Sequence, residues 1–207
     1  MKRIHRSLTP AALILLGILL GCAPGNVLTI PRDLAREAPP PAPGAAESPG
    51  VAVLDFSWAG PPSGEIGRDY DLVRPIVWKG NPGKSIADLI AGALAEKGIA
   101  AVRVAGEADV PADVPARVWG SLEEFRVNVK RAGTIKVEQE AVMTLKVQAV
   151  SPGVPEGWTG TVSSSYMDDY THVTPFVVYD TLNAAANAAA DEAVRRLLAA
   201  GIVFPLK

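Results

Sequence analysis

The spacing of apolar and polar residues has a period of two across the middle of the chain. From Val118 to Val147, apolar residues alternate with polar ones in two stretches that are separated by a turn near 131–133. This period is typical of β-strands with one buried and one solvated face. The pattern therefore predicts a long antiparallel hairpin, and 158–165 reads as a third antiparallel strand beside it.

The helical period appears in two other segments. A first helix is expected to begin at Ser85, because Ser85-Ile-Ala-Asp88 has the form of a capping box, and Gly98 suits the left-handed residue that ends a helix. A second helix is expected over about 181–200. Its face of alanines would let it lie close to a sheet.

Two apolar segments flank the first helix and complete the expected fold. Residues 51–58 read as a central strand, and 99–104 read as a strand parallel to it through a right-handed crossover. The sequence thus predicts one α+β domain over 51–207. We expect a mixed sheet of about five strands in the order β-α-β-β-β-β-α, with both helices on one face.

The connection from 59 to 84 is too long for a simple loop. Residues 72–78 read as a short edge strand, where Pro75 is tolerated. Long loops on a rigid scaffold are favoured places for binding. This loop and the end of the strand before it supply the candidate partner-binding residues, Trp58, Arg68, Tyr70, Arg74 and Trp78. The alternative is that Tyr70 and Trp78 only cover the end of the core.

The first 21 residues have the features of a secretory signal. A basic start with Lys2, Arg3 and Arg6 precedes an apolar run over 11–20. Ten apolar residues are too few to span a bilayer, which needs about 20. The run therefore fits the apolar region of a signal peptide over 1–21.

Leu19-Leu20-Gly21-Cys22 resembles the lipobox of bacterial lipoproteins. The resemblance implies cleavage after Gly21, a thioether-linked diacylglycerol on Cys22 and acylation of the new amino group. Two or more acyl chains anchor a protein stably where one does not. The resemblance also implies that Ala23, in place of an aspartate, directs the protein to the inner leaflet of an outer membrane, facing the periplasm. The alternative is an ordinary buried cysteine behind a plain signal peptide.

Residues 22–50 are expected to form a disordered tether. Seven prolines lie between Pro24 and Pro49, whereas every aromatic residue lies after position 50. A segment without aromatic side chains buries too little surface to offset its ordering entropy. The short apolar piece 27–30 is the exception, because it could dock on the domain or on a partner.

Composition excludes several classes of protein. One cysteine and two histidines cannot build a disulfide framework or a zinc ribbon. The net charge of -2 offers no basic excess for nucleic acid. Removing residues 1–21 leaves 17 basic residues against 22 acidic ones, so the mature surface is mildly acidic.

Two short motifs imitate catalytic or binding sites. Gly83-Lys84-Ser85 resembles the end of a phosphate-binding loop, but Trp78 stands where that loop needs glycine, so no nucleotide is expected. Asp168, Asp169 and His172 offer ligands to a metal, yet short acidic runs are usually solvated turns. We therefore expect no metal, no cofactor and no enzymatic activity.

The order of elements from 51 onward, including Trp119-Gly-Ser-Leu122 near the start of the hairpin, resembles a group of periplasm-facing lipoproteins. These are the YajG-like, TolB-amino-terminal-like and peptidoglycan-synthase-activator domains. The resemblance implies a non-catalytic module that binds a protein partner or helps to assemble an envelope complex. The partner would bind at the 59–84 loop or add a strand to an exposed edge of the sheet. The alternative is a carrier of an apolar ligand, such as a lipid, held between helices and sheet. The residues leave open which side of the outer membrane the domain faces.

Overall fold

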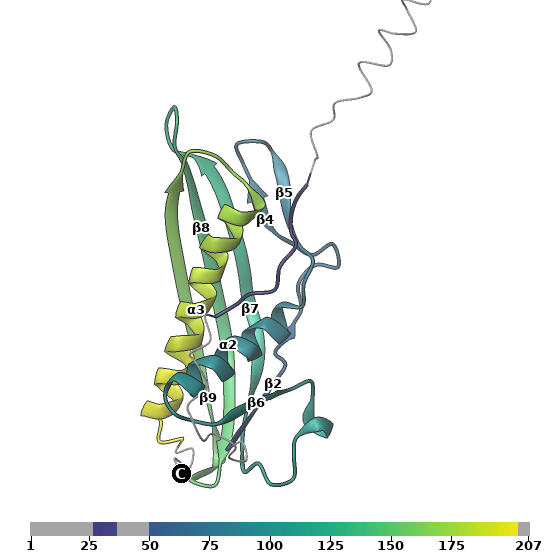
Figure 1. Ribbon diagram of the computed structural model, residues 1–207, viewed down its shortest axis with the longest axis vertical. Coiled ribbons are helices and arrows are strands. Elements are labelled where there is room, and N and C mark those ends of the chain that lie inside the picture. The colour runs from purple at the N-terminus through teal and green to yellow at the C-terminus, as the bar shows by residue number, and fades with distance from the viewer. Residues whose placement is uncertain (1–26, 37–49, 203–207) are drawn as a thin grey trace, which may run out of the picture.

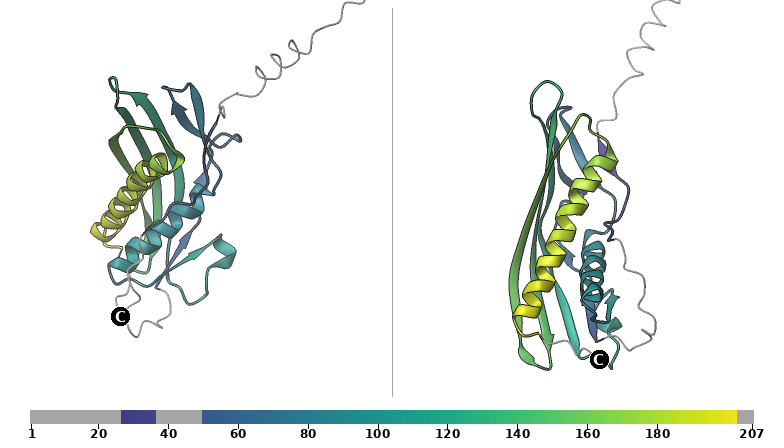
Figure 2. Two further views of the ribbon diagram at one scale, coloured as in Figure 1. Left: turned by 45° about the horizontal axis from the view of Figure 1, so that its top comes forward. Right: turned by 60° about the vertical axis from the view of Figure 1, so that its left-hand side comes forward.

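The computed structural model describes residues 27–36 and 50–202, which form one α+β domain. A mixed sheet carries both helices on the same face (Figures 1 and 2). The predicted fold class is confirmed. The number of strands is not, because the sheet has nine strands instead of about five.

Three long antiparallel strands form the larger part of the sheet. They are β7 (Ala116–Arg131), β8 (Val137–Ser151) and β9 (Val154–Tyr170). Along β8, buried residues alternate with more exposed ones from end to end. The predicted hairpin and its third strand are therefore confirmed, and each strand is longer than its sequence pattern indicated.

The predicted parallel crossover is also confirmed. Strand β2 (Val51–Leu54) pairs in parallel with β6 (Ala101–Val104), and α2 (Pro82–Glu96) lies between them in the chain. A loop with the 3-10 turn η1 (Glu107–Asp109) then leads to β7. A small second core lies apart from the main one and comprises Ala52, Leu54, Val104 and Val114.

The four other strands are short: β1 (Leu28–Ile30), β3 (Ser57–Trp58), β4 (Glu65–Asp69) and β5 (Arg74–Trp78). Strands β1 and β4 were not predicted, and the expected strand over 51–58 is divided into β2 and β3. Strand β5 was expected at the sheet edge, but it lies between β4 and β1. Its proline is tolerated there because the pairing with β1 begins one residue later, at Ile76.

The N-terminal segment 27–36 corrects the expected tether. Leu28, Ile30 and Leu34 are buried in the main core, so this part of 22–50 belongs to the folded domain. The apolar piece 27–30 therefore docks on the chain's own sheet, as one of its two expected roles allowed. The rest of the expected tether, the signal peptide and residues 203–207 lie outside the described residues.

Helix α2 begins three residues earlier than expected. Asn81 is its N-cap, with its side-chain oxygen accepting a hydrogen bond from the Lys84 amide at 3.1 Å, and Pro82 occupies the first turn. Asparagine is among the best N-caps, and proline is favoured directly after it. Ser85, which was expected as the cap, is instead fully buried inside the helix.

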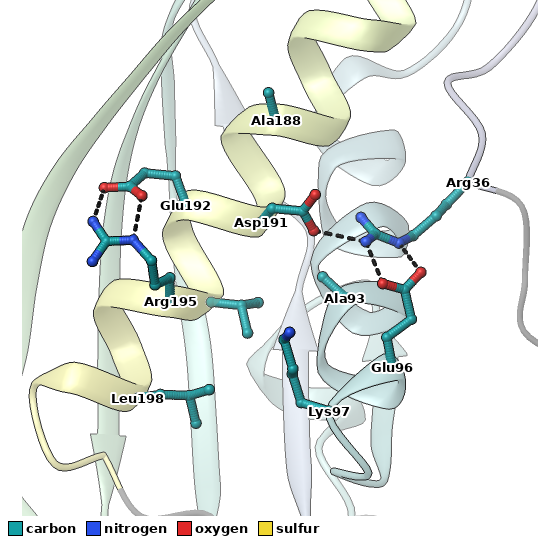
Figure 3. Close-up of a pocket in the computed structure, with 10 residues that line it drawn as sticks. Arg36, Ala93, Glu96, Lys97, Ala188, Asp191, Glu192, Arg195 and Leu198 are labelled. Atoms are coloured by element: carbon teal, nitrogen blue, oxygen red, sulfur yellow. Dashed lines mark hydrogen bonds and ion pairs between the residues drawn. The ribbon is translucent and has the colours of Figure 1, made fainter.

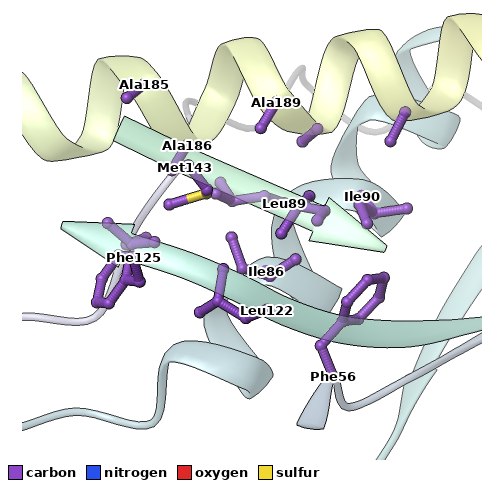
Figure 4. Packing of buried hydrophobic residues seen from close by; sticks show 14 of the residues in the cluster. Phe56, Ile86, Leu89, Ile90, Leu122, Phe125, Met143, Ala185, Ala186 and Ala189 are labelled. Carbon is purple, nitrogen blue, oxygen red and sulfur yellow. The ribbon is translucent and has the colours of Figure 1, made fainter. Parts of the chain in front are cut away.

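Helix α3 (Pro175–Ala199) lies across β7, β8 and β9 and contacts α2. Its alanine face packs against the sheet, as expected, and leaves room for the larger side chains below it (Figure 4). The labelled core residues of Figure 4 are Phe56, Ile86, Leu89, Ile90, Leu122, Phe125, Met143, Ala185, Ala186 and Ala189. Among the described residues, neither helix is both long and apolar enough to cross a membrane.

Candidate functional site

The two tryptophans of the predicted partner-binding set belong to the core. Trp78 is 3% exposed and meets Phe125 edge-on, with ring centroids 5.4 Å apart. Trp58 is half-buried and meets the same ring from another side at 6.0 Å. Trp78 is therefore not a surface residue, and the alternative role as a cover for the core is correct for it.

The other three residues of that set lie at one end of the sheet, in or beside the turn between β4 and β5. Tyr70 and Arg68 are exposed. Arg74 donates from Nε to Oδ2 of the fully buried Asp69 at 2.9 Å. The other oxygen of Asp69 accepts hydrogen bonds from the amides of Asp71 and Leu72, both at 3.1 Å. Arg74 is thus part of the framework that fixes this turn.

A second hairpin turn lies beside the first one. The Tyr70 amide donates to the Val129 carbonyl at 2.8 Å, and Arg131 donates to both carboxylate oxygens of Asp71 at 2.7 and 2.9 Å. The hydrogen bond from Arg131 lowers the pKa of Asp71 below its ordinary value. The turn after β7 also exposes Ile135, which the alternating pattern places among the apolar positions of the hairpin, so the expectation of a buried residue there is wrong.

Strand β9 has a long free edge. It pairs with β8 on one side, and no other strand of the described residues pairs with its other side. Between 158 and 170 the pairing with β8 is regular, so backbone groups of alternate residues point away from β8. Arg196 of α3 donates to the Thr161 carbonyl at 2.7 Å. Because this carbonyl is reached from outside the pair, the odd-numbered residues present their backbone outward.

The outer part of this edge, from Ser163 to Asp169, is accessible and mostly polar. Ser163, Ser165, Met167 and Asp169 are exposed on the strand, and their backbone amides and carbonyls face away from β8. A row of unpaired backbone groups of this kind can form hydrogen bonds with another extended chain. Sequence reasoning expected an exposed sheet edge but did not say which strand forms it, because the order of strands in a sheet leaves no periodic signal.

A groove of about 810 Å³ runs between α2 and α3 (Figure 3). Its apolar floor includes Ala93, Ala188 and Leu198. Arg36 crosses it from the N-terminal segment and pairs with Glu96 on α2 and with Asp191 on α3. The groove is therefore spanned by the chain itself.

Most of the charged side chains that line this groove are paired with one another. The hydrogen bond from Arg36 lowers the pKa of Glu96, and the hydrogen bonds from Arg195 and Arg196 lower the pKa of Glu192 to about 2. Walls of this kind favour water over an apolar ligand. No observation on this groove supports the alternative of a lipid carrier, which stays a prediction.

The structure explains why glycine stands at position 83 of the motif Gly83-Lys84-Ser85, which resembles a phosphate-binding loop. A side chain at Gly83 would meet the carbonyl oxygen of Phe56 at 1.8 Å, and the Phe56 amide donates to the Gly83 carbonyl at 3.2 Å. Glycine is thus required where α2 passes the end of β2. Lys84 lies within 3.8 Å of Asp33 and 3.5 Å of Asp88.

The acidic run does not gather into a metal site. Asp168 accepts a hydrogen bond from the Tyr170 hydroxyl at 3.1 Å, while Asp169 pairs with Lys136 at 3.1 Å. The His172 ring hydrogen-bonds with its neighbour Thr171. In the described part of the chain, no group of three His, Cys, Asp or Glu side chains is placed to hold a metal.

Comparison with known proteins supports the fold. Neither a protein-family model nor a curated protein matches the sequence significantly. Among solved structures, protein XCC0632 from Xanthomonas campestris, described under the family model DUF330, is 14% identical with a TM-score of 0.50. The match covers 85% of this chain and 96% of that one. A minor lipoprotein from Acinetobacter baumannii is 10% identical with a TM-score of 0.41, over 73% of this chain and 94% of that one.

At these identities, the likeness to the Xanthomonas protein shows a shared fold and nothing about activity or partners. The second TM-score is too low to carry an argument. The resemblance to the YajG-like, TolB-like and synthase-activator group is not confirmed by these matches. Lipidation at Cys22 stays a prediction as well, because Gly21 and Cys22 lie outside the described residues.

Proposed function

We propose that this protein is a lipid-anchored, non-catalytic subunit of a bacterial cell-envelope complex, and that a protein partner binds by adding an extended segment to the free edge of β9. The acyl chains on Cys22 hold it at the inner leaflet of the outer membrane, facing the periplasm. The observation that carries the proposal is the accessible edge from Ser163 to Asp169.

The edge supports strand addition because it is long, regular and only partly capped. In this binding mode the main chain supplies the hydrogen bonds and alternate side chains supply specificity. Natural proteins usually block such an edge with a short strand, a charge or a covering element. Here Arg196 caps Thr161, whereas Ser163 and Ser165 are small and exposed.

The outer face of the sheet is a weaker candidate for binding a protein partner than the edge of β9. Four of its charged residues pair across the strands, Lys130 with Glu138 at 2.7 Å and Arg126 with Glu140 at 4.0 Å. Charges that already pair within the sheet offer a partner little that is unsatisfied. The edge, by contrast, offers backbone groups with no partner strand.

Photocrosslinking in intact cells tests the edge. A photoreactive amino acid is placed at Ser165 on the edge, or at Lys146, which is exposed on the interior strand β8. We expect a crosslinked protein partner from position 165 and none from 146. Equal crosslinking from both positions would contradict binding at the edge.

A proline variant separates the edge from the fold. Ser165→Pro deletes an outward amide and leaves the hydrogen bonds to β8 in place, so the thermal transition should change little. With the photoreactive group at Met167, this variant should lose the partner. Retention of the partner would overturn strand addition, while an unfolded variant would be recognised by its lost transition and replaced by Ser163→Pro.

The anchor is tested separately from the edge. Replacement Cys22→Ser should release the protein from membranes at high salt, because no acyl chain can attach. A Cys22→Ser protein that still fractionates with membranes would show that lipid is not the anchor.

A further inference from the structure

Exposed apolar side chains gather at one end of the domain. The two neighbouring turns at 70–73 and 132–136 hold four of the nine large apolar side chains that are exposed in the described residues. We call this set the apolar tip; it comprises Tyr70, Leu72, Val73 and Ile135. Their exposed fractions run from 59% to 76%, which an interior packing role does not explain.

The backbone conformation of the turn at 70–73 is fixed by its surroundings. Val73 has a φ of 51°, a left-handed conformation that β-branched residues rarely adopt. Such strain persists only where the surroundings fix it, and here the buried Asp69 binds both the turn amides and Arg74. The turn therefore displays Leu72 and Val73 outward in a fixed arrangement, at a position that glycine or asparagine usually takes.

The chain enters the domain at the same end. Strand β1 runs parallel to β5 with Leu28 opposite Ile76, so Val27 lies beside the start of β5 and near the tip (Figure 1). Only five residue steps separate Val27 from Cys22. Five extended residues reach at most about 17 Å. An acyl anchor on Cys22 would thus keep this end of the domain within about 17 Å of the bilayer.

The charges around the tip are largely compensated. Arg131 pairs with Asp71, Lys136 with Asp169, and Lys130 with Glu138. A contact made by this surface would depend on its apolar side chains more than on attraction to anionic lipid headgroups. It should therefore resist salt.

We propose that the apolar tip inserts into the surface of the phospholipid bilayer to which Cys22 is anchored, so that the long axis of the domain stands away from the membrane. This inference rests on the lipid anchor of the proposed function. Two attachments, the acyl chains and the tip, fix the orientation of the domain and so the direction in which the free edge of β9 is presented.

Site-specific fluorescence on the full mature lipoprotein tests the contact. Leu72→Cys, Ile135→Cys and, as a control, Leu198→Cys are each labelled with an environment-sensitive dye; Leu198 is an exposed apolar residue near the far end of α3. The acylated Cys22 thiol does not react, so each variant takes one dye. The proteins are reconstituted into vesicles of phosphatidylethanolamine and phosphatidylglycerol.

The dyes at 72 and 135 should show a blue shift and strong quenching by spin-labelled lipid, and the dye at 198 should show neither. The blue shift should persist in about 1 M salt, where the Debye length is about 3 Å. Water-like emission at 72 and 135 would overturn the contact. Shielding that appears without vesicles and grows with protein concentration would identify a second copy as the occupant and also overturn it.

Mass spectrometry of the N-terminal peptide distinguishes this inference from its premise. Acylated Cys22 with water-exposed dyes at the tip overturns the tip contact and leaves the anchor standing. An unmodified Cys22 overturns the anchor and the inference with it. Loss of crosslinking at Ser165 bears on the partner alone.

Discussion

Arg36 binds the carboxylate of Glu96 with two hydrogen bonds, from Nε to Oε1 and from one terminal nitrogen to Oε2, both 2.5 Å long. The same terminal nitrogen donates to Asp191 on α3 at 2.7 Å. The end of the N-terminal segment is thereby tied to both helices (Figure 3). Because β1 belongs to the same segment, these hydrogen bonds help to hold residues 27–36 against the domain.

Loss of this pair should loosen the N-terminal segment. In Arg36→Gln, amides of 28–34 should exchange with solvent roughly fivefold faster, the ratio expected near the upper end for exposed ion pairs. The global thermal transition should move little. Arg195→Gln is the matched control, since Arg195 pairs with Glu192 on its own helix. Equal effects of both variants on 28–34 would contradict the tie.

The same pair predicts a dependence on pH. The hydrogen bond from Arg36 lowers the pKa of Glu96 from its ordinary 4.5, so the stabilisation is present above pH 4.5 and is lost as the pH falls through the lower folded value. Exchange of 28–34 should therefore accelerate below pH 4.5 beyond the change in intrinsic rate. Glu96→Gln should remove this acceleration, and an unchanged pH profile in that variant would refute the assignment.

The long strands and both helices could be predicted because their periodic patterns extend over ten residues or more. Val137 to Val147 alternates except at Gln139 and Val142, and the burial of β8 follows the alternation through both positions. The pattern is informative because one face of the strand is buried and the other is wet. In the same way, the helical spacing of the alanines in α3 predicted that they face the sheet.

Strands β1 and β4 could not be predicted, because segments of three to five residues carry no reliable period, whereas β2, β5 and β6 lie in apolar runs that the sequence shows. Strand β1 lies in a proline-rich segment whose composition indicates disorder, and its three residues are ordered by Ile76 and Trp78 of β5. The apolar tip could not be predicted from the sequence either. Leu72 and Ile135 look like core residues in sequence, and only the turn geometry shows that they are exposed.

The close contact of Gly83 with the Phe56 carbonyl predicts how a larger residue at position 83 affects stability. Gly83→Ala should destabilise the domain by about 2–3 kcal/mol, because the new methyl group would meet the Phe56 carbonyl at 1.8 Å and shift backbone. Gly106→Ala is the matched control, since nothing lies within 4 Å of its added carbon. Chemical denaturation measures both. A Gly83→Ala protein as stable as the control would refute the close packing of α2.

The strained residue of the tip predicts opposite effects on stability and on membrane contact. Val73→Asn should raise the free energy of unfolding by about 1 kcal/mol, because asparagine tolerates the left-handed conformation that costs valine about 1–2 kcal/mol. Leu72→Asn changes the neighbouring residue of the tip, which has no positive φ, and should give no such gain. Both variants remove an exposed apolar side chain, so both should weaken the blue shift of a dye at Ile135 on vesicles. If Val73→Asn gained stability and kept the full blue shift, the strain would be real but Val73 would have no part in the membrane contact.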